Sequence, residues 1–420
     1  MSIQTTTLEN GLRVVSDLIP NVETVSLGVW LNVGARHETQ HVNGIAHMLE
    51  HMAFKGTYQR TAAQIAEEIE AVGGYLNAYT ARESTAYYAR ILQQDADLAT
   101  GILADILQNS IFDESEFKRE QAVILQEIGQ ANDTPDDIVF DYFQETCYPN
   151  QPMGWPILGQ SKVVQALTPQ IVKNYMQQHY TADRMVFAAA GRIDHGALVE
   201  MVRKHFCMLP SSSSQATFCP SVYQGGDYRQ EKDLEQVHVV LGFEGVPYNH
   251  PHHYALAVLS TVLGGGMSSR LFQEVREKKG LVYTIYASST HYLDSGLFTI
   301  YAGTGQKEVA QLLPVVCEQL RTLPETLTSQ EVERAKTQLK ASLLMGLEST
   351  SNRGERVANQ MLIYGYPLTT SQILQAIDSV QKENLSRVAH HLFQSKPTLT
   401  TLGPIQDVMP FDQLCEHLKC

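Results

Sequence analysis

The segment 68–74 reads EIEAVGG, and a similar segment, EVREKKG, stands at 274–280 in the second half of the chain. Each has the pattern of a helix that ends at glycine. In both halves an alternating strand comes before this segment (24–30 and 237–243) and aromatic-rich strands come after it. An order of elements that recurs along a chain is the signature of an internal repeat. We therefore predict an α+β fold of two homologous domains, each an antiparallel β-sheet covered by α-helices.

The boundary between the halves falls in a serine-rich stretch. Residues 210–217 read PSSSSQAT, which has the composition of a linker. A chain of 420 residues is also too long for one ordinary core, so two domains are expected. We predict a first domain at 1–209, a linker at 210–225 and a second domain at 226–420.

The composition is that of a globular protein. Hydrophobic residues make up 43% of the chain and charged residues 18%, which excludes a disordered chain. The formal net charge of −14 argues against nucleic acid and anionic membranes as partners and favours basic substrates. Residues 1–7 lack the features of a signal peptide, and no apolar run has the length of a membrane span. The six cysteines contain no C-x-x-C pair, so we expect a reducing, cytoplasmic location without membrane insertion.

Two histidines one helical turn apart make a candidate metal site. The stretch 45–52, IAHMLEHM, has the apolar spacing of a helix and contains no proline. His47 and His51 would share one face, where two imidazoles can hold one Zn²⁺ and leave room for a third ligand and a water. Glu50 lies beside His51, close enough for its carboxylate to accept a proton from that water. The alternative is a chance histidine pair on a surface or core helix.

A second feature is a helix with two carboxylates on one face. Asp113 is a possible N-cap, with Glu116 three residues later, and 132–135 (NDTP) end the helix. Glu120 and Glu127 are seven residues apart and point the same way, with apolar residues between them. Carboxylates on a partly buried face are costly unless a cation or hydrogen bonds satisfy them. The alternative is a solvated glutamate stripe.

These motifs together resemble a known family. The H-x-x-E-H pattern at 47–51, followed by Glu127, resembles the pitrilysin-type (inverzincin) zinc peptidases of the M16 family. Within it the chain looks most similar to the M16B-type members, the mitochondrial processing peptidase beta subunit and its bacterial single-chain relatives. The matching stretches are 50–57 (EHMAFKGT), 73–80 (GGYLNAYT) and 125–129 (LQEIG), and the resemblance covers essentially the whole chain.

The resemblance implies a zinc endopeptidase with one Zn²⁺ per chain. His47, His51 and Glu127 would bind the metal, and Glu50 would deprotonate the metal-bound water. Glu120 would lie behind the ligands, where it orients one of them or balances the charge of the metal. Members of the family enclose their substrates in a chamber, so extended or unfolded peptides would be preferred over folded proteins.

The second half of the chain lacks these groups. With Gly56 aligned on Gly264, apolar residues stand where the first half has His47, Glu50 and His51. The second half kept the fold without the metal chemistry, which indicates one zinc site in the first half. The resemblance implies that two domains face each other across a cleft.

Two residues of the second half are implied to complete the active site across that cleft. In the family an arginine and a tyrosine at the spacing of Arg276 and Tyr283 reach the substrate backbone and the scissile carbonyl. A tyrosine hydroxyl and a guanidinium suit the stabilisation of a developing oxyanion. The alternative is an arginine at a helix end and a tyrosine in a core.

The resemblance also implies where a peptide would bind. An edge strand containing Asn77, Ala78 and Tyr79 would accept an extended substrate as an added strand, through main-chain hydrogen bonds that tolerate any sequence. Phe54 would contact the residue that follows the cleaved bond, although Phe54 could equally belong to the core.

Acidic residues after Glu127 suggest a preference for arginine near the scissile bond. If Pro135 starts a new helix, Asp137 and Asp141 share a face. They match the acidic positions with which the processing peptidase holds an arginine just before its cleavage site. Paired carboxylates suit a guanidinium because they offer directed, charge-assisted hydrogen bonds. The alternative is an acidic helix start that the helix dipole favours, which better explains Asp136.

The same family leaves one other function open. Some members are non-catalytic structural or partner subunits, such as core proteins of respiratory complexes, although those typically have degraded metal motifs. The bacterial relatives work as homodimers or pair with an inactive homologue. The resemblance therefore implies basic peptide substrates and one of these two kinds of pairing, in the bacterial cytoplasm.

Overall fold

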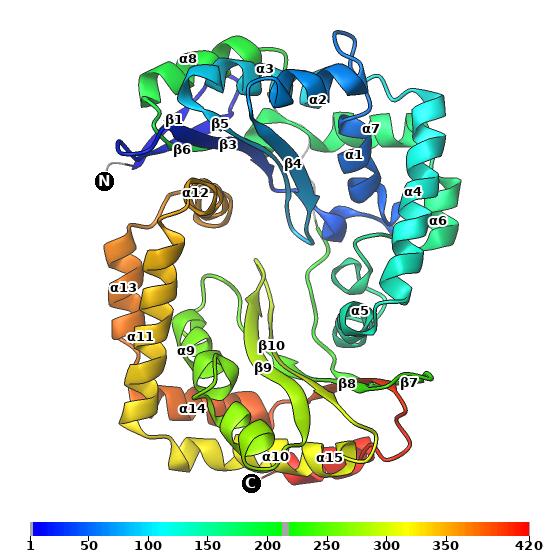
Figure 1. Ribbon diagram of the computed structural model, residues 1–420, viewed down its shortest axis with the longest axis vertical. Coiled ribbons are helices and arrows are strands. Elements are labelled where there is room, and N and C mark those ends of the chain that lie inside the picture. Colours follow the sequence, from blue (N-terminus) through cyan, green and yellow to red (C-terminus); the bar gives the residue numbers. More distant parts are fainter. Residues whose placement is uncertain (1–2, 212–217, 420) are drawn as a thin grey trace. The chain divides into compact units, whose positions relative to one another are not determined.

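The chain folds into two compact units, and neither unit is a continuous piece of sequence (Figure 1). The computed structural model describes residues 3–211 and 218–419, so part of the predicted linker lies outside the described residues. Unit 1 comprises Met1–Gln130, Trp155–Cys219 and Leu344–Leu368, and unit 2 comprises Ala131–Gly154, Pro220–Leu343 and Thr369–Cys420. The predicted division at 210–225 separates the two sheets but misses two exchanged segments, 131–154 and 344–368.

Unit 1 is built on a six-stranded sheet in the order β1-β2-β6-β3-β5-β4. Neighbouring strands are antiparallel except β2 and β6, which are parallel. The strands are β1 (Ile3–Thr7), β2 (Arg13–Leu18), β3 (Thr24–Leu31), β4 (Tyr75–Thr80), β5 (Thr85–Leu92) and β6 (Met185–Gly191). The helices are α1 (Ile45–Ala53), α2 (Ala62–Glu70), α3 (Ala96–Gln108), α4 (Glu114–Asn132), α6 (Ser161–Ala166), α7 (Pro169–His179), α8 (His195–His205) and α12 (Thr350–Tyr364). Short 3₁₀ turns are η1 (Ala35–His37), η2 (Gln40–Val42), η3 (Gln93–Asp95) and η5 (Ala182–Arg184).

Unit 2 repeats this plan on a five-stranded sheet in the order β7-β11-β8-β10-β9. Its parallel pair is β7 and β11. The strands are β7 (Gly226–Glu231), β8 (Val237–Glu244), β9 (Val282–His291), β10 (Gly296–Thr304) and β11 (Thr398–Gly403). The helical elements are α5 (Pro135–Cys147), η4 (Pro152–Gly154), α9 (His253–Gly264), the π-helical turn η6 (Phe272–Glu277), α10 (Val309–Thr326), α11 (Ser329–Gly346), α13 (Thr370–Asp378), α14 (Lys382–Gln394) and α15 (Phe411–Leu418). The predicted α+β class and the repeat are therefore confirmed.

The glycines that end the two repeated segments have the same backbone conformation, although the helical elements before them differ. Gly73 and Gly280 have φ values of +66° and +62°, which a residue with a Cβ rarely adopts. The first follows a regular α-helix, α2, whereas the second follows the π-helical turn η6. The repeat is thus preserved at the glycine and not in the helix before it.

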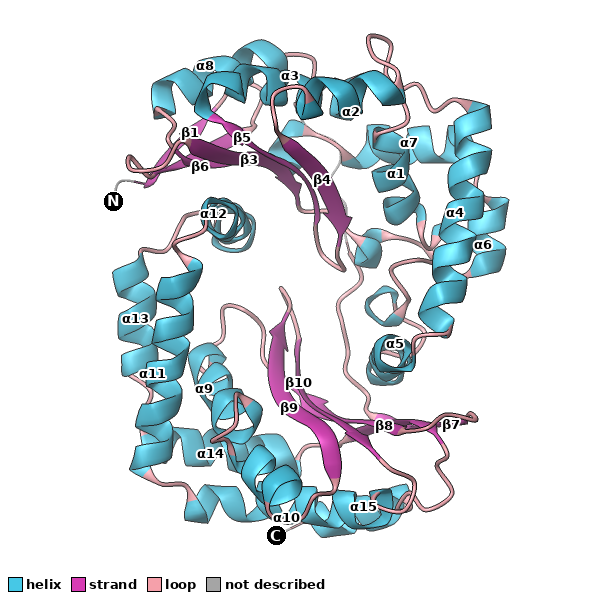
Figure 2. Ribbon diagram, viewed as in Figure 1, coloured by secondary structure: helices cyan, strands magenta, loops and turns pink. Residues whose placement is uncertain are grey.

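In unit 1, helices cover both faces of the sheet (Figure 2). Alternating residues of β3 separate these faces, because successive side chains of a strand point to opposite sides. Val25, Leu27 and Val29 enter the main core with α1 and α3, whereas Trp30 enters a second cluster with Val357 and its neighbours on α12.

The helix on that second face comes from the far half of the sequence. In return, α5 of the first half covers the equivalent strands of unit 2, where Val139 and Phe143 pack against Val240 and Leu402. The two halves have therefore exchanged equivalent helices.

A glycine makes room for the exchanged helix in unit 2. A Cβ on Gly242 of β8 would lie 2.3 Å from Cζ of Phe143 on α5. Real Cβ atoms do not approach another carbon so closely, so any other residue at 242 would force the ring of Phe143 to move from its place against the sheet. The identity of residue 242 is thus tied to a helix about a hundred residues earlier in the chain.

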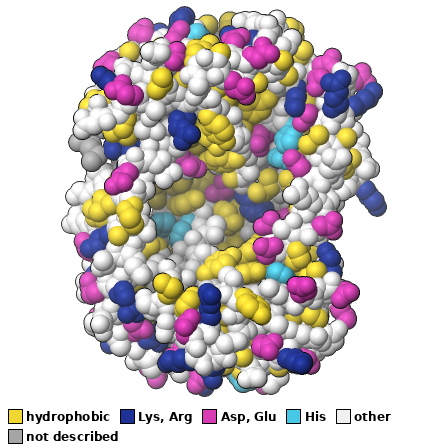
Figure 3. Space-filling model, viewed as in Figure 1, with side chains coloured by type: hydrophobic (Ala, Val, Ile, Leu, Met, Phe, Trp, Pro, Cys, Tyr) yellow, Lys and Arg dark blue, Asp and Glu magenta, His cyan; other side chains and the backbone are white. Residues whose placement is uncertain are grey.

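The surface carries charges of both signs. On the face seen in Figure 3, acidic and basic side chains are interspersed, so the net negative charge forms no single patch there. None of the helices within the described residues combines the length and the apolar character needed to cross a bilayer.

Candidate metal centre

The polar side chains of helix α1 lie on one face because its other face is buried in the core. Ile45, Met48, Leu49 and Met52 are at most 1% exposed. These residues recur at helical spacing, so burying them turns the remaining side chains, among them His47, Glu50 and His51, the other way. All three are half-buried.

The start of α1 is held by a residue that the sequence reasoning missed. The buried carboxylate of Glu38 accepts hydrogen bonds from the amides of Gly44 (2.8 Å) and Ala46 (2.9 Å) and from Asn43 Nδ2 (2.9 Å). These amides belong to the first turn, whose donors have no partner inside the helix. The signal in the sequence was weak: the N-cap of α1 is Gly44, which has no side chain to cap the helix, so the cap had to come from elsewhere.

Helix α4 brings in the two glutamates. Asp113 caps it as predicted, accepting hydrogen bonds from the amides of Ser115 (2.8 Å) and Glu116 (3.1 Å), and the helix ends at Asn132. Phe117, Glu120 and Ile124 are buried on its inner face. Glu127 lies seven residues after Glu120 and follows the same face, so the prediction that both carboxylates point one way is confirmed.

Three of the predicted ligands converge. His47, His51 and Glu127 each offer a ligand atom, and these atoms all lie within 4.8 Å of one another. Oε2 of Glu127 is 3.8 Å from Nε2 of His47 and 3.6 Å from Nε2 of His51. The same Oε2 atom is buried and has no hydrogen-bond partner.

This geometry fits Zn²⁺. Two ligands of a tetrahedral zinc ion at its usual bond lengths lie about 3.3 Å apart, close to the separations found here and longer than a hydrogen bond needs. Two imidazole nitrogens and one carboxylate oxygen are also a common donor set of catalytic zinc, with the fourth position left open. Burial, helped by the proximity of His51, lowers the pKa of His47 to about 4, so this imidazole is neutral and able to bind a metal.

Glu120 lies behind His51, as predicted. Its Oε2 is 2.9 Å from His51 Nδ1, and its Oε1 is 2.7 Å from the ammonium of Lys55. Burial alone would raise the pKa of Glu120, but hydrogen bonds from Lys55 and His51 outweigh burial and lower it. An ionised Glu120 makes Nδ1 of His51 the protonated nitrogen, which leaves Nε2 with its lone pair toward Glu127 and the metal position.

Glu50 is tied to the neighbouring strand. The hydroxyl of Thr80, at the end of β4, donates a 2.6 Å hydrogen bond to Oε2 of Glu50. Burial raises the pKa of Glu50, and the hydrogen bond from Thr80 opposes that rise. Thr80 therefore holds the candidate base beside the histidines and joins it to the strand predicted to receive a peptide.

That strand, β4, lies at the edge of its sheet. Asn77 is exposed, donates to the hydroxyl of Tyr75, and accepts a hydrogen bond from the amide of Ala78 at 2.8 Å. The hydroxyl of Tyr79 donates to Glu355 of α12 at 2.9 Å, so its side chain is engaged by that helix and not by the strand edge. Phe54 is half-buried and packs on the main core, with its ring 6.1 Å from that of Tyr87.

The remaining predicted residues belong to unit 2, whereas the metal ligands belong to unit 1. Arg276 lies in η6 with its guanidinium 4.7 Å from the ring centre of Phe272, and Tyr283 on β9 is 71% exposed. Asp137 and Asp141 lie one turn apart on α5, which begins at Pro135 as expected. The alternative of a buried, core Tyr283 is thus excluded, while the part of all four residues in catalysis or binding stays a prediction.

The sequence matches two family models. Residues 13–161 match insulinase (peptidase family M16), and residues 166–339 match the peptidase M16 inactive domain. The chain belongs to peptidase family M16. The inactive type of the second match agrees with the absence of the metal residues from the repeat, and within 3–211 and 218–419 the group at His47, His51 and Glu127 is the one cluster able to hold a metal.

Relatives and solved structures agree with this assignment. An uncharacterized zinc protease of Rickettsia felis is 40% identical, over 94% of this chain and 96% of its own. The uncharacterized zinc protease YmxG of Bacillus subtilis is 40% identical, over 95% and 97%. The probable mitochondrial-processing peptidase subunit beta of Arabidopsis thaliana is 38% identical, over 97% and 80%.

Among solved structures, a protease from Helicobacter pylori superposes with a TM-score of 0.86 at 26% identity, over 96% of this chain and 99% of that one. A chain of complex III2 from Candida albicans gives 0.89 at 19% identity, over 99% and 100%, and shares the fold.

Proposed function

We propose that this protein is a zinc-dependent endopeptidase that cleaves extended or unfolded peptides. The observation that supports this proposal is the convergence of His47, His51 and Glu127 beside the carboxylate of Glu50. Zinc, when bound there, supplies a Lewis acid that polarises the scissile carbonyl and makes a bound water more acidic. The zinc proteases among its relatives support the same chemistry.

The residues of the chain divide the remaining work. Glu50 accepts the proton of the attacking water and delivers it to the leaving amine, while Thr80 fixes the orientation of that carboxylate. Glu120 and Lys55 hold His51 in the tautomer that binds metal. The open edge of β4 receives the peptide backbone, and the amide of Ala78 exchanges its bond to Asn77 for one to the substrate.

The finer features of the substrate are also part of the proposal. Asp137 and Asp141 would select an arginine near the scissile bond through charge-assisted hydrogen bonds, and Phe54 would contact the residue after the cleaved bond. Arg276 and Tyr283 would stabilise the developing oxyanion from unit 2.

We further propose that the protein acts in the cytoplasm, as a homodimer or paired with an inactive homologue. No disulfide joins the described cysteines, which supports a reducing compartment. Light scattering of the purified chain, together with an activity assay, tests the pairing. A homodimer should have twice the chain mass, whereas a chain that needs an inactive homologue should be a monomer without activity.

One experiment tests the function itself. The purified chain is assayed for zinc by mass spectrometry and is incubated with an unfolded protein, whose cleavage sites are then mapped. We expect about one zinc per chain, peptide-bond cleavage that 1,10-phenanthroline abolishes, and recovery when zinc is returned.

Two variants of the same helix sharpen this test. Glu127→Ala should lose zinc and activity, whereas Glu116→Gln, an acid on the outer turn of α4, should keep both. If the wild-type chain binds zinc and cleaves nothing, either alone or with its natural partner, the non-catalytic alternative is correct.

A further inference from the structure

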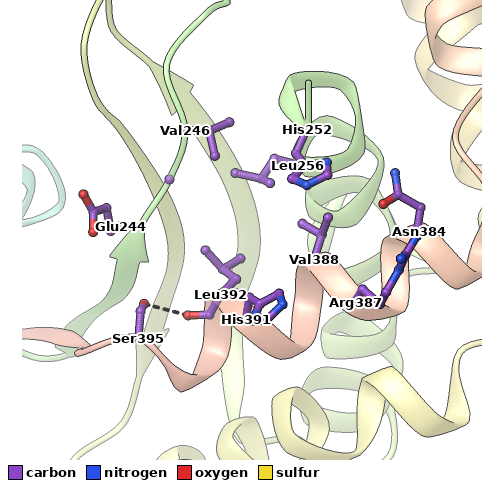
Figure 4. A pocket seen from close by; sticks show the side chains of 11 residues that line it. Glu244, Val246, His252, Leu256, Asn384, Arg387, Val388, His391, Leu392 and Ser395 are labelled. Atoms are coloured by element: carbon purple, nitrogen blue, oxygen red, sulfur yellow. Dashed lines mark hydrogen bonds between the residues drawn. The ribbon is translucent and has the colours of Figure 1, made fainter. Parts of the chain in front are cut away.

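Unit 2 contains a cavity that the proposed chemistry does not use. Its volume is about 360 Å³, and it lies between the end of β8, the start of α9 and one face of α14 (Figure 4). Small-molecule sites in proteins occupy roughly 300–1,000 Å³, so the cavity is large enough for a small ligand. None of its lining residues belongs to the candidate metal centre.

The middle of the cavity is apolar. Leu256 of α9 and Val388 and Leu392 of α14 line it and are 1%, 6% and 7% exposed. Val246 completes this wall. Such a surface favours an apolar body of ligand, at about 25 cal/mol for each Å² removed from water.

One end of the cavity carries cationic and hydrogen-bonding groups. Asn384, Arg387 and His391 follow one another on the same face of α14, and His252 lies opposite them at the N-cap of α9. Arg387 makes no ion pair or side-chain hydrogen bond among the described residues. The start of α9 adds the positive end of its helix dipole.

His252 at this end has a buried polar atom without a partner. Its Nδ1 is shielded from solvent and makes no hydrogen bond with any described residue. Burial lowers the pKa of His252, and His250, Arg387 and His391 lower it further. A neutral His252 adds no charge at this end, and the cationic Arg387 would be satisfied by an anionic oxygen.

The other end of the cavity carries a carboxylate. Glu244, the last residue of β8, lies across the apolar middle from Arg387 and Asn384 (Figure 4). Its side chain makes no hydrogen bond or ion pair within the described part of the chain, and partial burial raises its pKa. A cation placed there would compensate this carboxylate.

We propose that this cavity binds a short apolar peptide as a zwitterion. The terminal carboxylate of the peptide bonds to Arg387, its terminal ammonium pairs with Glu244, and its side chains cover Leu256, Val388 and Leu392. The order of anion site, apolar wall and cation site matches the order of charges along a dipeptide. This proposal does not depend on the peptidase activity, because the cavity shares no residue with the metal centre.

Three probes that differ only at their ends test the proposal. Leu-Leu carries both charges, N-acetyl-Leu-Leu only the carboxylate, and Leu-Leu-amide only the ammonium. Binding is measured by calorimetry on the full-length Glu50→Gln chain, so that no probe is consumed. Leu-Leu should bind tightest, and removal of either charge should weaken binding about tenfold or more.

Two variants assign the ends. Arg387→Gln should weaken Leu-Leu and N-acetyl-Leu-Leu at least about tenfold and leave Leu-Leu-amide unchanged. Glu244→Gln should weaken Leu-Leu and Leu-Leu-amide and leave N-acetyl-Leu-Leu unchanged. Lys382→Gln and Glu383→Gln remove charges from the same helix outside the cavity and should change nothing.

Three results would overturn the proposal. The first is no saturable binding of Leu-Leu. The second is an equal loss for all three probes in both variants, which would indicate a binding site elsewhere or a damaged fold. The third is N-acetyl-Leu-Leu binding as tightly as Leu-Leu with no effect of Glu244→Gln, which would make the cavity a site for apolar carboxylates. Melting temperatures of Arg387→Gln and Glu244→Gln are measured beside the titrations. A lowered melting temperature identifies a damaged fold.

Discussion

Oε2 of Glu120 lies 2.9 Å from Nδ1 of His51, on the side of the imidazole that faces away from Glu127. The buried carboxylate and the histidine thus form a pair in which one nitrogen is committed to a hydrogen bond and the other is free for a metal. The pair joins α4 to α1 and makes the metal affinity depend on a residue that does not touch the ion.

Glu120→Gln should therefore lower zinc affinity about 10- to 100-fold, the usual effect of losing such a partner. The amide can still accept from Nδ1 but lacks the charge that favours this tautomer. Competition with a fluorescent zinc chelator measures the affinity, and Glu116→Gln serves as the control. Unchanged affinity in Glu120→Gln would show that the contact with His51 is incidental.

Glu50→Gln should keep the metal and lose turnover. All three ligands survive in this variant, but the amide cannot take a proton from water, so we expect a loss of kcat of about a thousandfold or more. Zinc content and kcat are measured on the same preparation. A variant that keeps both zinc and most of the wild-type kcat would exclude Glu50 as the base.

Neutralising the acidic face of α5 should change substrate choice. Asp137→Asn with Asp141→Asn should raise KM for peptides with arginine near the scissile bond and leave KM for neutral peptides nearly unchanged. Asp136→Asn, on the same first turn, is the matched control. If the double variant affects both peptide sets alike, these aspartates are only a helix start.

The buried ion pair between α12 and the sheet of unit 1 should dominate the stability of that contact. Arg353 donates from Nε and Nη2 to the two carboxylate oxygens of Asp17 at 2.8 and 2.6 Å, and both side chains are buried. Asp17→Asn removes the carboxylate charge that faces this buried guanidinium and should cost about 3–5 kcal/mol.

The reporter for this loss is built into the chain. Its two tryptophans, Trp30 and Trp155, both belong to unit 1. Urea unfolding followed by tryptophan fluorescence therefore reads unit 1, with the exposed Glu67→Gln as control. A midpoint shift no larger than that of the control would contradict the assignment.

The pair of Arg270 and Glu331 should make unit 2 sensitive to acid. Nε and Nη2 of Arg270 donate to the two oxygens of Glu331 at 2.6 and 2.9 Å, and Thr328 adds two further bonds in the capping box of α11. Burial alone would raise the pKa of Glu331, but these bonds lower it to about 2. The folded state therefore holds this proton less tightly than the unfolded chain does.

It follows that Glu331 stabilises the fold fully above its unfolded pKa and loses this contribution as the pH falls from about 4.5 toward 2. At pH 6, Glu331→Gln should be about 1–3 kcal/mol less stable than wild type, and the difference should vanish near pH 2. Unfolding followed by circular dichroism at several pH values measures it, with exposed Glu318→Gln as control. A difference that does not depend on pH would rule out the ion pair as its source.

The elements with local sequence signals were predicted from the sequence, whereas the exchange of α5 and α12 between the two units was not. The strands at 24–30 and 237–243, the cap at Asp113 and the new helix at Pro135 carry their signals in neighbouring residues, and all are present. The positions of α5 and α12 depend on which sheet face each helix covers. That choice is recorded only in distant partners, such as Gly242 for Phe143.

The same distinction holds within the metal centre. The ligands and Glu50 stand in a motif, and their spacing alone places them on one helix face. Glu38 and Thr80, which hold α1 and Glu50, reach the site from a loop and from the end of a strand. Nothing in a single sequence aligns a threonine with a glutamate 30 positions away, so these supports emerged only from the fold.

The position of α12 sets an order of events for a chain being made on a ribosome. Asp17 emerges 336 residues before its partner Arg353. At roughly 5–20 residues per second, the sheet of unit 1 waits on the order of ten seconds or more with Trp30 and its neighbours uncovered. Throughout that interval the nascent chain exposes an apolar surface. A messenger RNA truncated before α12 would therefore yield an aggregation-prone fragment and not a stable first domain.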